Sequence, residues 1–132
     1  MSVTALDHLL VLTDDIDATR DFYCRALGLQ VGERPPLEFS GYWLYSGEVA
    51  CVHVADREEF AAHSDRVGIP ASPDAVDHIA FSGEDYEEAL ARLEREGVEA
   101  ATNEVPAVGL RQLFLEDPNG LKIEINVMPR GE

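Results

Sequence analysis

The first half of the chain combines short apolar runs with one stretch of helical periodicity. Residues 6–12 form an apolar run that ends at a polar Thr-Asp-Asp sequence, which is typical of a buried strand. Apolar residues then recur at helical spacing from Ile16 to Leu27, and Gly28 is a typical helix terminus. This pattern predicts a strand, a helix and then three further strands, with a turn at Gly47-Glu48 and with strand-like runs at residues 30–34, 42–46 and 49–54.

The second half of the chain repeats this order. Residues 76–81 form an apolar run, residues 86–93 have one apolar helical face, and Gly97 is expected to end the helix. Ser82 and Asp85 have the spacing of a capping box at the start of that helix. Strand-like runs follow at residues 99–103, 110–116 and 122–127, and the Asp-Pro-Asn-Gly sequence at 117–120 is a strong turn signal.

The repeat predicts an α+β fold class, with two tandem βαβββ modules that form a mixed sheet. We expect a single domain of residues 1–132, with the modules at 4–56 and 76–128. The connector at 57–75 is expected to contain a polar helix, at about 57–67, and a proline-rich segment.

The composition narrows the classes of function. The chain has 132 residues, of which 45% are hydrophobic, so it can bury the core of one domain. Its formal net charge of −16 repels phosphate backbones, and we therefore expect no nucleic-acid partner. No apolar run approaches the roughly 20 residues that span a bilayer, and no signal peptide is visible, so no membrane partner is expected. With two cysteines and no disulfide framework, a cytoplasmic location is the simplest expectation.

Four polar residues occupy matched positions in the two modules. His8 and His78 lie near the start of each module, and His53 and Glu124 lie in the closing strands, 45 and 46 residues later. If a pseudo-twofold axis relates the modules, these side chains converge on one point. Imidazole and carboxylate groups suit one divalent ion, such as Fe, Zn, Ni, Mn or Co. His53 is open to two interpretations, since a three-ligand site with open positions is equally sensible.

Other residues are candidates for contact with a substrate. Trp43 and Tyr45 share one face of a predicted strand, where they form either an aromatic wall of a binding site or ordinary core packing. Arg111 either pairs with a substrate carboxylate or balances nearby acidic residues. Cys51 is expected on the same strand face as His53, as an inert thiol.

The motifs, taken together and in order, resemble the vicinal oxygen chelate superfamily of glyoxalases, bleomycin-resistance proteins and extradiol dioxygenases. The resemblance covers about residues 4–128 and rests on Asp7-His8, Asp77-His78, Phe22-Tyr23 before Leu27-Gly28-Leu29, and Asp117-Pro118-Asn119-Gly120 before Ile123-Glu124. It implies that the strands curve into a cup of the glyoxalase/dioxygenase type, with a metal ion on the concave side. The ligands that it implies are His8, His53, His78 and Glu124.

The resemblance also implies a function. We expect a divalent-metal-dependent enzyme that acts on a small, vicinally oxygenated substrate, either dioxygenase-like or glyoxalase-like (a lyase or isomerase), with Glu124 and His53 as catalytic groups. His53 departs from the lactoylglutathione lyases, which have a carboxylate at this position. The alternatives are a metal-dependent antibiotic-resistance protein and a metal-free binding protein like the bleomycin-resistance proteins. Members of this size are often homodimers, and we therefore expect a homodimer here.

Overall fold

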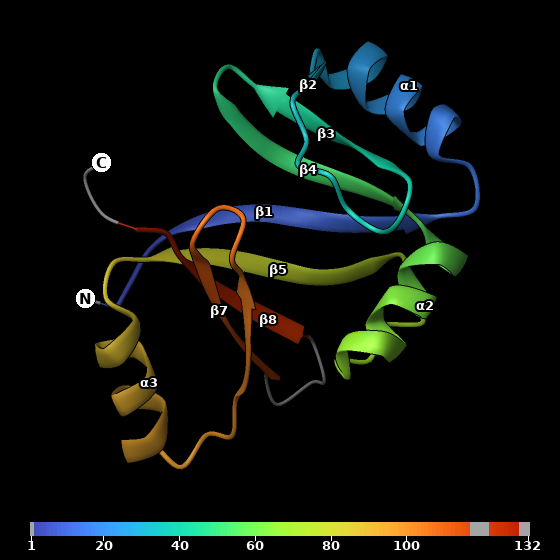
Figure 1. Cartoon of the computed structure of the whole chain (residues 1–132). Coiled ribbons are helices and arrows are strands. Elements are labelled where there is room, and N and C mark those ends of the chain that lie inside the picture. Colours follow the sequence, from blue (N-terminus) through green and yellow to red (C-terminus); the bar gives the residue numbers. More distant parts are fainter. Residues whose placement is uncertain (1, 117–121, 130–132) are drawn as a thin grey trace. The chain divides into compact units, whose positions relative to one another are not determined.

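The computed structural model describes residues 2–116 and 122–129. Helices and strands alternate along these residues (Figure 1). Their bounds in chain order are β1 Val3–Thr13, α1 Ile16–Leu27, β2 Gln30–Gly32, β3 Gly41–Ser46, β4 Val49–Asp56, α2 Arg57–Val67, β5 Val76–Gly83, α3 Tyr86–Arg95, β6 Ala101–Val105, β7 Leu110–Glu116 and β8 Lys122–Val127.

The element order is βαβββ twice, with α2 between the two copies, and the predicted α+β fold class is confirmed. The strands are hydrogen-bonded in the order β2-β3-β4-β1-β5-β8-β7-β6. The sheet is mixed, because β1 pairs with β4 in parallel while the hairpins β3-β4 and β7-β8 are antiparallel. The predicted turn at residues 117–120 lies outside the described residues. No helix in the described part of the chain is long and apolar enough to cross a membrane.

Two compact units make up the chain. Residues 8–78 form one, called here the 8–78 unit, and residues 1–7 with 79–132 form the other, called the terminal unit. The boundary cuts β1 after Asp7 and β5 after His78. The module boundaries expected from the sequence, at 4–56 and 76–128, stay a prediction.

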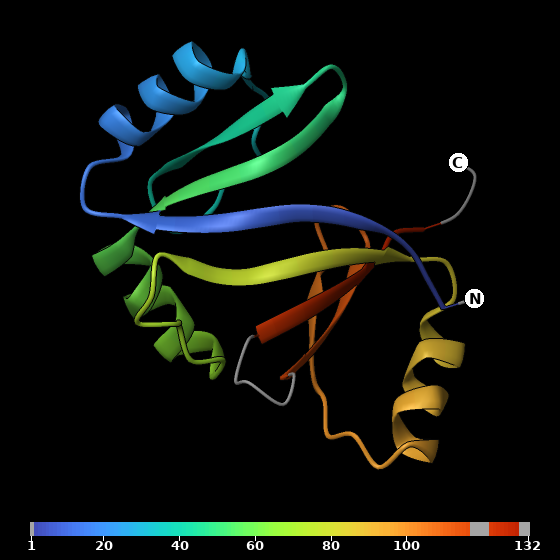
Figure 2. The same cartoon turned by 180° about the vertical axis from the view of Figure 1, so that it is seen from behind.

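In the 8–78 unit, α1 covers one face of the strands (Figure 2). Leu44, Val52 and Val54 are buried there, and the α1 residues Ile16 and Tyr23 pack against them. The helix begins where the Asp15 side chain accepts a hydrogen bond from the Ala18 N–H, and it ends at Gly28, whose φ of 76° suits glycine. The helix limits expected from the sequence are therefore confirmed.

Helix α2 packs on the opposite face of the same strands, at one end. Phe60 of α2 packs there against Leu10, Leu12 and Ala55. His8 precedes Leu10 by two residues and therefore lies on the same face of β1. Farther from α2, this face presents Trp43, which lies directly opposite His53 in the β3-β4 pair.

A β-bulge corrects the expectation for Cys51. Leu44 pairs with Val52 but Tyr45 pairs with Ala50, so Cys51 is the extra residue in the ladder. The simple alternation of faces therefore fails at this point. Cys51 packs against the core cluster beneath α1, and the prediction that it shares the face of His53 is wrong.

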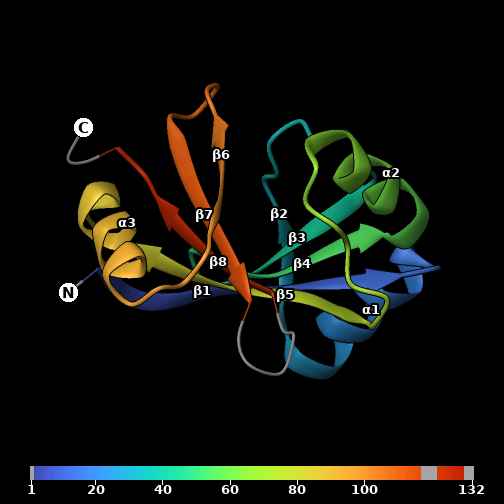
Figure 3. The same cartoon turned by 90° about the horizontal axis from the view of Figure 1, so that it is seen from below.

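In the terminal unit, α3 packs on one face of β7 and β8 (Figure 3). Ala89 of the helix lies against Leu113, Ile125 and Val127. The predicted capping box is wrong: the side chain of Asp85 caps the helix by accepting from the Glu88 N–H. Ser82 still belongs to β5, and its hydroxyl donates to Asp7 Oδ1 at 3.0 Å.

Candidate metal centre

His78 is held by an acidic neighbour at the start of β5. Asp77 and His78 are 0% and 6% exposed. Asp77 Oδ2 lies 2.9 Å from His78 Nδ1, while Asp77 Oδ1 accepts from the Ser72 backbone N–H at 2.5 Å. Because a carboxylate accepts hydrogen bonds, Nδ1 carries a proton, and the tautomer with its single proton on Nδ1 has its lone pair on Nε2. This arrangement orients His78 as a ligand through Nε2.

His8 presents the matching nitrogen. It is buried, and its Nε2 lies 3.2 Å from Nε2 of His78. Two nitrogens that each lie about 2.1 Å from one metal ion are about 3.0–3.4 Å apart at ordinary coordination angles. The spacing of the two histidines therefore fits a shared divalent ion.

Glu124 supplies a buried carboxylate from β8. It is 5% exposed and lies directly opposite Phe114 in the β7-β8 pair. The strand alternates, so Glu124 faces away from Ile125 and from the core beneath α3. His8, His78 and Glu124 form a group in which one ligand atom of each lies within 4.8 Å of the others. Two imidazoles and a carboxylate form a donor set that suits Fe, Zn, Ni, Mn or Co.

His53 is not a member of that group among the described residues. Its ring stacks on His8, with the centroids 3.7 Å apart and the planes 14° apart. Its Nε2 lies 3.1 Å from the carbonyl oxygen of Ala50. Because a carbonyl oxygen accepts hydrogen bonds, Nε2 of His53 carries a proton in this arrangement. Its role as a fourth ligand or as a catalytic group stays a prediction.

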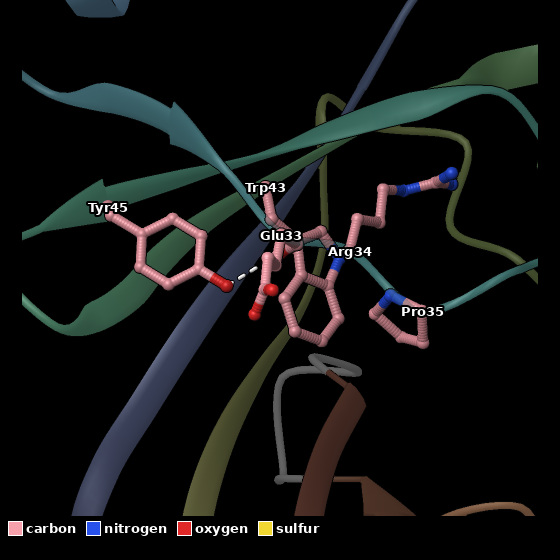
Figure 4. Close-up of a pocket in the computed structure, with 5 residues that line it drawn as sticks. All are labelled: Glu33, Arg34, Pro35, Trp43 and Tyr45. Atoms are coloured by element: carbon pink, nitrogen blue, oxygen red, sulfur yellow. Dashed lines mark hydrogen bonds between the residues drawn. The ribbon is translucent and has the colours of Figure 1, made fainter.

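Trp43 and Tyr45 line a pocket in the 8–78 unit, and the Trp43 ring stacks on His53. The pocket has a volume of about 480 Å³ and is open to solvent. Figure 4 shows its lining, to which the segment Glu33, Arg34 and Pro35 also contributes. Burial lowers the pKa of Arg34 below its ordinary value. The sequence did not predict that this segment lines a pocket, because tertiary packing alone decides where side chains that follow a strand end lie.

Arg111 lies on the sheet face opposite Glu124. It pairs with Val127 in the β7-β8 ladder, and Val127 belongs to the core under α3. The guanidinium lies 3.7 Å from the ring centroid of Tyr86 and forms ion pairs with Glu87 and Glu104. These contacts favour the interpretation in which Arg111 balances nearby acids.

A row of amides lies on the same face as Glu124, and the sequence analysis did not identify it. Asn103 Nδ2 donates to Gln112 Oε1 at 2.8 Å, and Gln112 Nε2 donates to Asn126 Oδ1 at 3.1 Å. The three residues face one another across β6, β7 and β8. Each strand contributes one of these polar residues, but they can be recognised as a row only once the register of the strands is known.

The chain resembles known proteins over nearly its whole length. The chain is 30% identical over 128 residues to "Glyoxylase I 4" of Arabidopsis thaliana, which covers 95% of this chain and 71% of that protein. It is 28% identical over 130 residues to the uncharacterized protein YaeR of Escherichia coli, over 95% of this chain and 97% of YaeR.

The fold also matches solved structures. The methylmalonyl-CoA epimerase of Mycobacterium tuberculosis superposes with a TM-score of 0.71 at 21% identity, over 96% of this chain and 89% of the epimerase. A family model named Glyoxalase/Bleomycin resistance protein/Dioxygenase superfamily matches residues 5–125. The motifs, the fold and these matches agree, and the chain belongs to the glyoxalase/bleomycin resistance protein/dioxygenase superfamily.

Proposed function

We propose that this protein is a metal-dependent enzyme in which His8, His78 and Glu124 hold one divalent ion. The observation that carries the proposal is the orientation of the two histidines. Asp77 fixes the proton of His78 on Nδ1, and Nε2 of His8 lies at ligand spacing from Nε2 of His78.

The ion supplies Lewis-acid chemistry to a substrate that chelates it through two adjacent oxygens. Three protein ligands leave coordination positions open for those oxygens. Glu124 is proposed as the group that accepts a proton from the substrate carbon or hydroxyl. His53, with its ring stacked on His8, is proposed as a second acid/base group beside the substrate.

A glyoxalase-like reaction, of the lyase or isomerase type, is the first candidate. The name of the Arabidopsis relative supports it. A dioxygenase-like reaction is the second candidate, because two histidines and one carboxylate are the donor set of non-haem Fe(II) oxygenases. Oxygen uptake with Fe(II)-loaded protein and a catechol would favour the dioxygenase. Isomerisation of an α-ketoaldehyde–thiol adduct without oxygen uptake would favour the glyoxalase.

Metal analysis of protein purified without a histidine tag tests the proposal. We expect about one equivalent of divalent metal per chain after reconstitution. Glu124→Gln keeps the side-chain shape but removes the charged ligand, so metal affinity should fall at least about tenfold. Glu104→Gln is the matched control, because this exposed carboxylate pairs with Arg111 on the other sheet face.

Two results would count against the enzyme. Less than about a tenth of an equivalent after reconstitution would favour the metal-free binding protein instead. Equal loss of affinity in Glu104→Gln and Glu124→Gln would mean that overall charge, and not a ligand bond, controls metal uptake.

A further inference from the structure

The pocket beside the histidines has an aromatic floor that is fixed in place. The Trp43 indole stacks on His53, with the ring centroids 4.0 Å apart and the planes 10° apart. His53 in turn stacks on His8, so the three rings form one column. One face of the indole is therefore covered by His53. The indole also belongs to the lining of the solvent-open pocket, so part of its surface is accessible to a ligand.

Tyr45 forms a wall next to this floor. Its hydroxyl donates to the carbonyl oxygen of Glu33 at 2.6 Å (Figure 4). The ring lies so close to β2 that a Cβ at Gly32 would be 2.6 Å from two of its carbons. Glycine at position 32 is therefore required for this ring position. A wall held by a hydrogen bond and by backbone contact loses little entropy when a ligand binds.

The charged side chains that line the pocket do not favour an anionic ligand on this aromatic surface. The Arg34 guanidinium donates to the Phe39 carbonyl oxygen at 2.6 Å and lies 5.3 Å from the Phe39 ring centroid. Figure 4 shows it pointing away from Trp43. Glu33 adds an exposed carboxylate to the lining. The ligand that suits this surface is therefore flat and carries no negative charge.

We propose that this pocket is a second subsite, which binds a planar, uncharged aromatic or conjugated ring of the substrate on the outer face of Trp43. The inference rests on the proposed function and extends it by naming a substrate class. In this proposal the ring lies three stacking steps from His8, beyond His53 and Trp43, and the substrate is long enough for its oxygen-bearing end to extend to the ligand histidines. Offset stacking on indole supplies the affinity for the ring.

The chain contains one tryptophan, so the indole N–H resonance of Trp43 reports on this pocket alone. We would titrate metal-free protein with quinoxaline, a flat neutral ring, and compare it with cyclohexanol and with naphthalene-2-sulfonate. Quinoxaline should shift the resonance saturably, and the other two should bind at least about tenfold more weakly. Trp43→Leu, followed by calorimetry, should weaken quinoxaline binding about tenfold.

Two further variants test whether a change in quinoxaline binding arises within the pocket or from a general effect on the fold. Gly32→Ala displaces the Tyr45 ring while leaving both aromatic residues in the chain, and it should weaken binding severalfold. Tyr42→Phe is the matched control, because Tyr42 contacts Asp17 and Arg20 of α1 on the other face of β3. Binding should be unchanged in this variant.

The outcomes are distinct from those of the metal experiments. Quinoxaline binding that persists in Glu124→Gln supports the subsite even if the proposed metal centre fails. Absence of a saturable shift, or equal binding of cyclohexanol, would overturn the subsite while leaving the metal proposal intact. Tighter binding of the sulfonate would also overturn it, since the pocket would then be an anion site built on Arg34.

Discussion

Asp77 is the residue on which the orientation of the candidate metal centre depends most. It is fully buried, and both carboxylate oxygens are engaged, one by His78 and one by the Ser72 N–H. An aspartate that holds a ligand histidine fixes both the tautomer and the ring plane. The sequence motif Asp77-His78 showed the pair, but it did not show that the carboxylate points at the ring.

Asp77→Asn should therefore lower metal affinity without removing a ligand. The amide is a weaker acceptor, and its NH₂ group cannot accept from Nδ1, so His78 loses its preferred tautomer. We expect a loss of roughly 10- to 100-fold in metal affinity, measured by competition with a chelator. Asp74→Asn, at an exposed position three residues earlier, is the control and should leave affinity unchanged. Equal affinity in both variants would contradict the positioning role.

Some residues of the candidate site could be predicted from the sequence, and others could not. His8, His78 and Glu124 were predicted because the internal repeat places them at equivalent positions. Gln112 and its amide partners depend on strand register, and Glu33, Arg34 and Pro35 depend on how the chain folds back after β2. Contacts of this kind arise from tertiary packing, and they leave no periodic signal in a single sequence.

At the scale of elements, helix limits were predicted more accurately than strand limits. The polar helix expected at about 57–67 is α2, Arg57–Val67, because Asp56 caps it and Gly68 ends it with a φ of 78°. The run expected at 30–34 is shorter, at Gln30–Gly32, because Glu33 and Arg34 turn towards Tyr45 and Phe39. The run expected at 99–103 is shifted to Ala101–Val105, where it pairs with β7.

The core beneath α1 contributes to the stability of the β3-β4 hairpin. Leu44 is 0% exposed and lies in the cluster with Val52 and Val54. Leu44→Ala should destabilise the fold by about 2–5 kcal/mol, through lost burial and a cavity. Val49→Ala, at a position that is 56% exposed, should change stability by less than about 0.5 kcal/mol. Urea denaturation of both variants tests this, and equal midpoints would contradict the assignment.

The contact between α2 and the segment before β3 should depend on pH. Glu38 accepts from His63 and Arg66, and these hydrogen bonds lower the pKa of Glu38 below its ordinary value. A lowered folded-state pKa contributes stability that is present above the ordinary carboxyl pKa and is lost as the pH falls through the lowered value.

Glu38→Gln removes this titration. Its stability should fall less steeply with acid than that of the parent chain, as measured by thermal melts across the acid range. The effect should be small, because Glu38 is exposed and solvent screens the pair. An identical slope in both proteins would show that the contact contributes nothing.

At the scale of the whole molecule, family membership and fold class are established by the family model and by the order of elements. The net charge of −16 adds long-range repulsion of anions, which agrees with a ring subsite that lacks a cation directed at the ligand.

The homodimer expected from the resemblance is a further prediction at this scale. Light scattering on gel-filtered protein should give twice the mass of one chain at micromolar concentration. A mass of one chain at every concentration tested would contradict it, and the metal proposal would be unaffected, because His8, His78 and Glu124 belong to one chain.

The most direct test of the central claim is a crystal structure of metal-loaded protein with anomalous data collected at the absorption edge of the metal. One strong anomalous peak should lie about 2.0–2.2 Å from Nε2 of His8, Nε2 of His78 and a carboxylate oxygen of Glu124. A peak bound by other side chains, or these three residues turned away from one another with no metal between them, would contradict the proposed centre.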